Sequence, residues 1–107
     1  MRRSTQFAIE FAPETVEHVG AIERKHHSLI RKTIDKQLTY APEKETRNRK
    51  PLEQPAPFGA TWELRFGPGN GFRVFYEVDS DERTVWILAI GVKQRNRLLI
   101  AGEEFEL

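Results

Sequence analysis

The sequence predicts an α+β domain in which an antiparallel sheet carries helices on one face. Three patterns predict this class. Residues 62–66 and 72–78 alternate hydrophobic and polar side chains around the glycine-rich segment 67–71, as the two strands of a β-hairpin do. Residues 83–91 are apolar on both faces, which is typical of a central strand. The stretch between Pro13 and Pro42 repeats its hydrophobic residues at helical spacing instead.

Length and composition predict one soluble domain. The chain has 107 residues, no cysteine and a formal net charge of +1. This length fits a single domain, residues 1–107, which buries a modest core without disulfides or thiolate metal sites. No apolar run is long enough for a signal peptide or a transmembrane helix, so we expect a cytoplasmic protein with no membrane partner.

The other elements follow from the same kinds of pattern. We expect a first strand over residues 5–11 and a helix that begins near Pro13, because proline suits the first turn. The helical stretch is a hairpin or one long bent helix, and a loop over residues 41–59 has room for one short strand. A short helix is expected over residues 93–101. The N-terminal helical stretch is expected to turn these residues toward the sheet: Val16, Val19, Ile22, Leu29, Ile30, Ile34 and Leu38.

The predicted hairpin has one hydrophobic face and one face that carries two arginines. Alternation places Glu63, Arg65, Arg73 and Phe75 together on the second face, which we expect to be open. These charges form either a solvated ion pair, worth well under about 1 kcal/mol, or part of a nucleic-acid site. Arginines interleaved with an aromatic ring on a sheet often hold single-stranded RNA. The core face is expected to consist of Trp62, Leu64, Phe66, Phe72, Val74, Tyr76 and Val78.

Two short basic runs could form a rim around this face. The first, residues 44–50, includes Arg47, Arg49 and Lys50, and the second, residues 93–97, includes Lys93, Arg95 and Arg97. Such runs are either solvated loops or sites for phosphate. We expect Arg47, Arg49 and Lys50 to bind the RNA backbone. Phe75 would stack on a base, and Arg97 would also bind the RNA.

The sequence contains no pattern typical of a metal or cofactor site. Adjacent His26 and His27 would point about 100° apart on a helix, so they cannot share one ligand. We expect surface or capping roles for them and for His18. No HExxH motif, carboxylate cluster or phosphate-binding glycine loop occurs, so neither a metal nor a cofactor is expected.

Several segments in a fixed order indicate a family. The chain resembles the RelE/ParE superfamily of toxins from type II toxin–antitoxin systems in FAIEFAPE, RKPL, WELR, GFRVFYEV, ILAIGVKQRNRL and GEE. The resemblance covers nearly the whole chain. It implies a curved antiparallel sheet of about four strands, two N-terminal helices on one face and a short C-terminal element. It also implies a cognate antitoxin as partner, in a toxin–antitoxin hetero-oligomer.

The resemblance implies two different activities. RelE-like members cleave mRNA on the ribosome without a metal, whereas ParE-like members poison DNA gyrase. Arg73 matches the arginine of the RelE pattern, and Arg65 matches its LR pair, but Thr61 and Glu63 stand where RelE-type members carry lysines. The RelE tyrosine near the C-terminus has no counterpart. We favour mRNA cleavage as an endoribonuclease; gyrase inhibition, or a toxin fold that acts only with its antitoxin, remains open.

RNA cleavage assigns roles to five residues. The reaction needs a base, cations for the developing charge and a donor for the leaving oxygen. Glu63 would be the base, Arg65 and Arg73 would neutralise charge, and Lys93 or Arg95 would lie near the leaving group. The alternative is that Glu63 only pairs with an arginine. We expect the antitoxin to cover the open face or to displace the C-terminal element.

Overall fold

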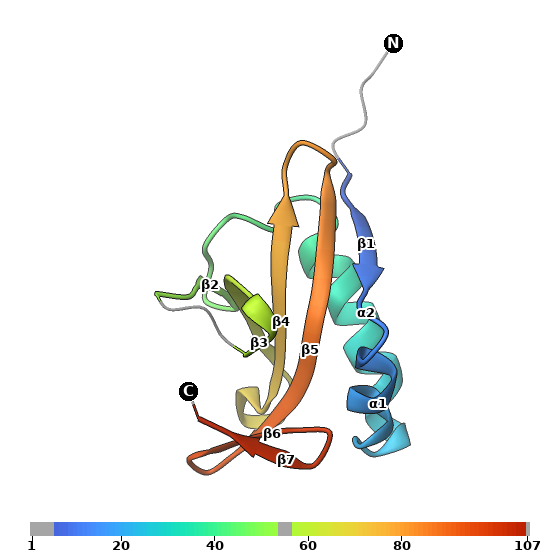
Figure 1. Cartoon of the computed structure of the whole chain (residues 1–107), viewed down its shortest axis with the longest axis vertical. Helices are drawn as coiled ribbons and strands as arrows, with labels where there is room; N and C mark the ends of the chain where they lie inside the picture. Colours follow the sequence, from blue (N-terminus) through green and yellow to red (C-terminus); the bar gives the residue numbers. More distant parts are fainter. Residues whose placement is uncertain (1–5, 54–56, 107) are drawn as a thin grey trace.

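The computed structural model describes residues 6–53 and 57–106, which form an α+β fold built on one sheet (Figure 1). Its α-helices within these residues are α1 (Thr15–Gly20) and α2 (His27–Leu38), and the sheet has seven strands rather than about four. The strands are β1 (Ala8–Phe11), β2 (Arg49–Pro51), β3 (Trp62–Phe66), β4 (Phe72–Asp79), β5 (Thr84–Gln94), β6 (Arg97–Ile100) and β7 (Glu103–Phe105). Short 3-10 turns are η1 (Arg24–His26), η2 (Pro57–Gly59) and η3 (Pro68–Asn70).

The sheet is antiparallel except for its first strand. The order is β2-β3-β4-β5-β6-β7, and β1 pairs in parallel with the first half of β5, from Ala8 opposite Thr84 to Phe11 opposite Ile87. The predicted hairpin β3–β4 and the central strand β5 are confirmed. The short strand expected in the loop is β2, which pairs with the outer edge of β3.

The helices cover one face of the sheet and form the main core with it (Figure 1). The predicted core face of β3 and β4 is confirmed, as are Ile22, Ile30, Ile34 and Leu38. Val16 and Leu29 contradict the prediction, because they are 76% and 42% exposed. The helix α1 has only six residues and turns Thr15 and His18 inward instead.

The C-terminal segment is a β-hairpin rather than the expected helix over residues 93–101. The strand β5 continues to Gln94, the chain turns at Arg95 with φ 59°, and β6 returns along it. In Figure 1 this hairpin crosses the lower end of the sheet. Gly91 permits the close approach, because a Cβ there would lie 2.7 Å from the carbonyl oxygen of Leu99.

The hairpin closes a second core on the face away from the helices. Its fully buried members are Ala60, Phe75, Ala89, Leu98 and Ile100, and Leu52, Leu88 and Phe105 pack against them. The face of the sheet that the sequence predicted to be open is therefore partly covered. What remains of it is a polar region around Glu63, Arg65 and Arg73.

Candidate functional site

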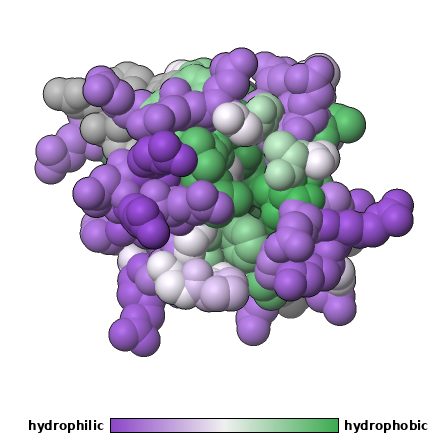
Figure 2. Space-filling view, turned by 90° about the horizontal axis from the view of Figure 1, so that it is seen from below, coloured by the Kyte–Doolittle hydropathy of each residue, from purple (hydrophilic) through white to green (hydrophobic). Residues whose placement is uncertain are grey.

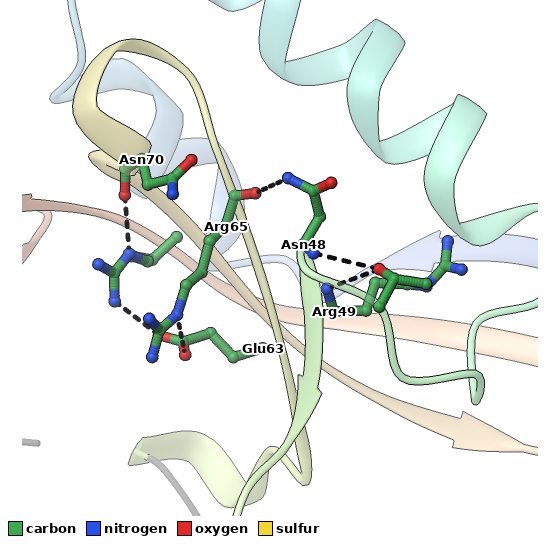
Figure 3. A network of polar contacts seen from close by, with 7 residues as sticks. Asn48, Arg49, Glu63, Arg65 and Asn70 are labelled. Atoms are coloured by element: carbon green, nitrogen blue, oxygen red, sulfur yellow. Dashed lines mark hydrogen bonds and ion pairs between the residues drawn. The ribbon is translucent and has the colours of Figure 1, made fainter.

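The polar region is a cluster of two arginines held by one glutamate, here called the arginine cluster (Glu63, Arg65 and Arg73). Antiparallel pairing of β3 with β4 places Arg65 directly opposite Arg73, and Glu63 lies two residues before Arg65 on the same face. Nε of Arg65 donates to Oε1 of Glu63 at 2.9 Å, and Nη1 of Arg73 donates to Oε2 at 3.1 Å. Figure 3 shows the guanidinium group of Arg65 turned toward the carboxylate of Glu63.

Burial separates the three members of the arginine cluster. The side chains of Glu63 and Arg73 are 3% and 6% exposed, whereas that of Arg65 is 33% exposed. Nε of Arg73 also donates to the carbonyl oxygen of Asn70 at 3.0 Å, so this arginine braces the turn between β3 and β4. The expectation of a solvated ion pair is therefore wrong for Arg73, whose charge is largely removed from water.

Glu63 has no free carboxylate oxygen in this arrangement. Each oxygen accepts a hydrogen bond from a different arginine. Transfer of a proton to Glu63 would remove the negative charge that both guanidinium groups pair with, which is costly. The alternative weighed for Glu63, a structural partner of arginine, is therefore the one that the geometry favours over a general base.

Phe75 does not offer a ring for base stacking. Its side chain is completely buried, and Leu98 and Ile100 of β6 belong to the same hydrophobic cluster. Alternation along β4 placed Phe75 correctly on the face of Glu63, which lies directly opposite in the register. The expectation of exposure is wrong because the C-terminal hairpin covers this part of the face.

The first basic run is divided between two faces. Lys50 pairs in register with Glu63, so it lies on the face of the arginine cluster and is exposed, as is Arg47. Arg49 is buried and faces α2: its Nη1 donates to the backbone and side-chain oxygens of Gln37 at 2.5 and 3.0 Å. Its Nε donates to the carbonyl oxygen of Lys44 at 3.0 Å. The expected contact of Arg49 with RNA is wrong because its guanidinium fastens the loop to the helix.

The second basic run surrounds the β5–β6 turn. Lys93 is half-buried and lies two residues beyond Gly91, the partner of Arg73, so it shares the face of the arginine cluster. Arg95 and Arg97 are exposed at the tip of the hairpin, where Nη1 of Arg97 lies 3.9 Å from Oε1 of Glu104. The structure thus places Lys93 with the arginines and leaves Arg95 and Arg97 at the tip.

His18 has an internal role that the sequence did not predict. It is 4% exposed, and its Nδ1 accepts a hydrogen bond of 3.2 Å from the backbone N–H of Ile90. β1 ends before this point of β5, so the imidazole satisfies a backbone donor at the strand edge. Burial lowers the pKa of His18 below its ordinary value of 6.5, against smaller upward effects of Glu14 and Glu17.

His26 and His27 are partly buried, and His26 makes no side-chain capping bond to α2. His27 lies at the start of α2, with Nε2 2.7 Å from the carbonyl oxygen of Ile22, and the His26 ring packs on Phe72. In residues 6–53 and 57–106 no three His, Asp or Glu side chains gather closely enough to hold a metal ion. The helices of these residues are all too short or too polar to cross a membrane.

An apolar groove lies between the two helices, here called the helix groove. Its volume is about 490 Å³. Exposed hydrophobic side chains mark this side of the molecule, namely Phe11 at 46% and Val16 at 76%, both of which line the groove. Leu29 on α2 is also exposed, at 42%. The other residues that line it are Thr15, Val19, His27, Ile30, Arg31, Ile34 and Ile90.

Comparison with known proteins identifies relatives of this chain. The family model described as the ParE toxin of the type II toxin–antitoxin system parDE matches residues 9–97. A chain of the Mycobacterium tuberculosis toxin–antitoxin complex RelBE2 has a similar fold, with a TM-score of 0.62 and 17% sequence identity. That similarity covers 82% of this chain and 99% of the other. No curated protein matches the sequence.

Proposed function

We propose that this chain, which belongs to the ParE toxin family of type II toxin–antitoxin systems, inhibits its target by binding it and not by cutting RNA. The proposed target is DNA gyrase, which ParE-like toxins poison. One observation carries this choice over the mRNA cleavage that the sequence favoured: both carboxylate oxygens of Glu63 are occupied by arginines.

Glu63 is poorly placed to act as the base of RNA cleavage at the arginine cluster. Attack by a 2′-hydroxyl needs a group that accepts its proton. Glu63 is the carboxylate of this cluster, and it is already held by two guanidinium groups. Thr61 occupies another position at which RelE-type members carry a lysine. A surface that binds a protein target does not need such a base.

Ribosome-associated mRNA cleavage is the second candidate, and Arg65 favours it. The side chain of Arg65 is one-third exposed and engages Glu63 through Nε, so its outer edge faces solvent. Lys50 and Lys93 lie on the same face and add positive charge there. A guanidinium beside two ammonium groups is suited to hold an RNA phosphate.

The proposed partner surface for the cognate antitoxin is the helix groove. Exposed hydrophobic side chains that gather in one place commonly mark an interaction site. Val16 is the most exposed of them, and Ile30 and Ile34 form an apolar floor between the helices. An amphipathic helix that lays its apolar face into such a groove is a common mode of recognition. The sequence predicted the antitoxin on the open face or in place of the C-terminal element, and the helix groove is proposed instead.

Pulse labelling after induced expression tests the proposed function. Gyrase inhibition predicts that incorporation of thymidine falls first, while incorporation of methionine continues. An early loss of methionine incorporation, with cut mRNA, supports the second candidate. Normal growth with normal incorporation of both labels would support the third alternative, a toxin fold that acts only with its antitoxin. Co-expression of the neighbouring antitoxin should restore growth in the first two cases.

A further inference from the structure

A second apolar hollow lies at the lower end of the molecule, here called the lower hollow. Three separate segments build it: the end of α1 with η1, the turn between β3 and β4, and the end of β5. Ile22, Phe72 and Val92 contribute apolar side chains, and the His26 ring lies with its centroid 5.0 Å from that of Phe72. The volume is about 310 Å³.

The lower hollow lies at the end of the molecule that Figure 2 shows. Figure 2 shows this end of the molecule, with hydrophobic residues gathered near the centre and hydrophilic residues around them. Ile22 and Phe72 are 9% and 6% exposed, so they belong to the main core and also line this hollow. An apolar side chain from a partner would extend the core at this point.

Exposed basic residues stand next to lining residues of the lower hollow along the chain. Lys93 lines it, Arg24 and Lys25 of η1 follow the lining residue Glu23, and Arg95 follows Gln94. Within residues 6–53 and 57–106, none of these four basic side chains makes an ion pair. Four unpaired cations beside one acidic residue favour an acidic partner.

We propose that the lower hollow receives one apolar side chain, such as leucine or phenylalanine, from an acidic segment of the cognate antitoxin. This inference rests on the antitoxin partner of the proposed function. The apolar side chain fills the space above Ile22 and Val92, and flanking carboxylates pair with Lys93 and the cations of η1. The antitoxin therefore contacts the toxin at two places, the helix groove and the lower hollow.

The two places lie on either side of one short helix. Val19 of α1 lines the helix groove, and Ile22, three residues later, lines the lower hollow. Consecutive Cα atoms are about 3.8 Å apart, so these two residues are separated by at most about 11 Å. In the same way His27 lines the groove and His26 the hollow. A chain that leaves the groove thus reaches the hollow directly, which favours the antitoxin over an unrelated occupant.

Nucleic acid fits the lower hollow less well. Stacking of a base needs an exposed aromatic face, and Phe72 is almost fully covered. The apolar side chains that line the hollow favour a peptide with an apolar anchor instead.

The test compares a variant whose lower hollow is filled by a larger side chain with a matched control variant. Ala21 is exposed and lines the hollow, so Ala21→Trp fills it from the rim without disturbing the core. Asp81→Trp places the same ring on the exposed turn between β4 and β5, which is the opposite end of the molecule in Figure 1. The probe is the purified small protein encoded beside the toxin gene, and its affinity is measured by titration calorimetry for folded variants.

If the antitoxin occupies the lower hollow, its affinity for the toxin should fall about tenfold to a hundredfold in Ala21→Trp. In Asp81→Trp the affinity should fall less than about threefold. Lys93→Glu should slow association and reduce its dependence on salt, and it also tests the hollow if Ala21→Trp fails to fold. Affinity of Ala21→Trp within twofold of the wild type overturns the proposal. The proposal is also overturned if the wild-type toxin sediments as a dimer and Ala21→Trp sediments as a monomer, because a second toxin chain would then occupy the hollow.

The outcome is independent of the gyrase proposal. If Ala21→Trp loses affinity for the antitoxin while the wild-type toxin has no effect on gyrase, the lower hollow stands and the proposed target fails. If the toxin inhibits gyrase and Ala21→Trp binds the antitoxin normally, the proposed target stands and the lower hollow fails.

Discussion

Nη1 of Arg73 lies 3.1 Å from Oε2 of Glu63, and both side chains are almost entirely buried. The pair lies between the second core and the turn of the β3–β4 hairpin. An arginine that the sequence suggested as a surface catalyst is thus part of the interior. Its replacement should change stability before it changes anything else.

Arg73→Ala should therefore destabilise the fold by about 3 kcal/mol, the lower end of the usual cost of breaking a buried ion pair. The lower end applies because Arg65 still holds the other oxygen of Glu63. Urea unfolding measures the change. Arg47→Ala is the control, because Arg47 is exposed, and its effect should stay within about 0.5 kcal/mol. Equal stability of the two variants would mean that the pair contributes nothing to folding.

The sequence predicted the hairpin well because period-two alternation reports directly which side chains share a face. It did not report whether that face is covered. The cover over Phe75 comes from Leu98 and Ile100, which arrive through a turn with Arg95 at positive φ, a conformation that favours glycine or asparagine. The two-residue turn, Arg95-Asn96, contains no glycine, and residues 93–101 therefore suggested a helix.

The same limit explains the errors at the candidate site. Arg49 was grouped with exposed neighbours because the basic run looked like a loop, but in β2 alternate residues face opposite sides. Arg49 meets Gln37 of α2, a contact between distant parts of the sequence. The hydrogen bond of His18 goes to Ile90, which lies beyond the part of β5 that pairs with β1. No local sequence pattern predicts that contact. The sequence predicted that Glu63 can pair with an arginine, but it did not predict that Glu63 and Arg73 are buried.

His18 should make stability depend on pH. Its pKa is lowered in the folded protein, chiefly by burial, so the folded state keeps it neutral where the unfolded chain binds a proton. The stabilisation is complete above the ordinary pKa of 6.5 and is lost as the pH falls below it toward the folded pKa. Urea unfolding at pH 7.5 and pH 5.5 measures this loss. His18→Gln, which cannot take up a proton here, should lose less stability over the same interval; an equal loss would assign the effect to other groups.

The helix groove should be needed for neutralisation and not for folding. Val16 is 76% exposed, so Val16→Glu should fold normally while it places a charge in the proposed antitoxin surface. We expect affinity for the antitoxin to fall at least about tenfold, so that co-expression no longer restores growth. Tyr40→Glu is the control, since Tyr40 is 60% exposed and lies outside the groove. If Val16→Glu binds the antitoxin with normal affinity, the antitoxin must bind a surface other than the helix groove.

Arg65 distinguishes the two candidate activities. If it holds the transition state of RNA cleavage, Arg65→Ala should lower cleavage by about two to three orders of magnitude. A partly exposed contact to a protein target usually contributes less than about 1 kcal/mol, which is about fivefold in affinity. We expect the smaller effect on toxicity, measured as the growth rate at matched toxin levels. Complete loss of toxicity in a folded Arg65→Ala variant would favour mRNA cleavage.

The most direct measurement titrates purified toxin into ATP-dependent supercoiling of relaxed plasmid by gyrase, with a parallel reaction on ribosomes programmed with mRNA. Because Glu63 is held by both arginines, we expect supercoiling to stop at toxin concentrations that leave the mRNA uncut. The cognate antitoxin should restore supercoiling when added in equal amount. Full gyrase activity together with cut mRNA would contradict the proposed function and would indicate that the arginine cluster takes part in mRNA cleavage.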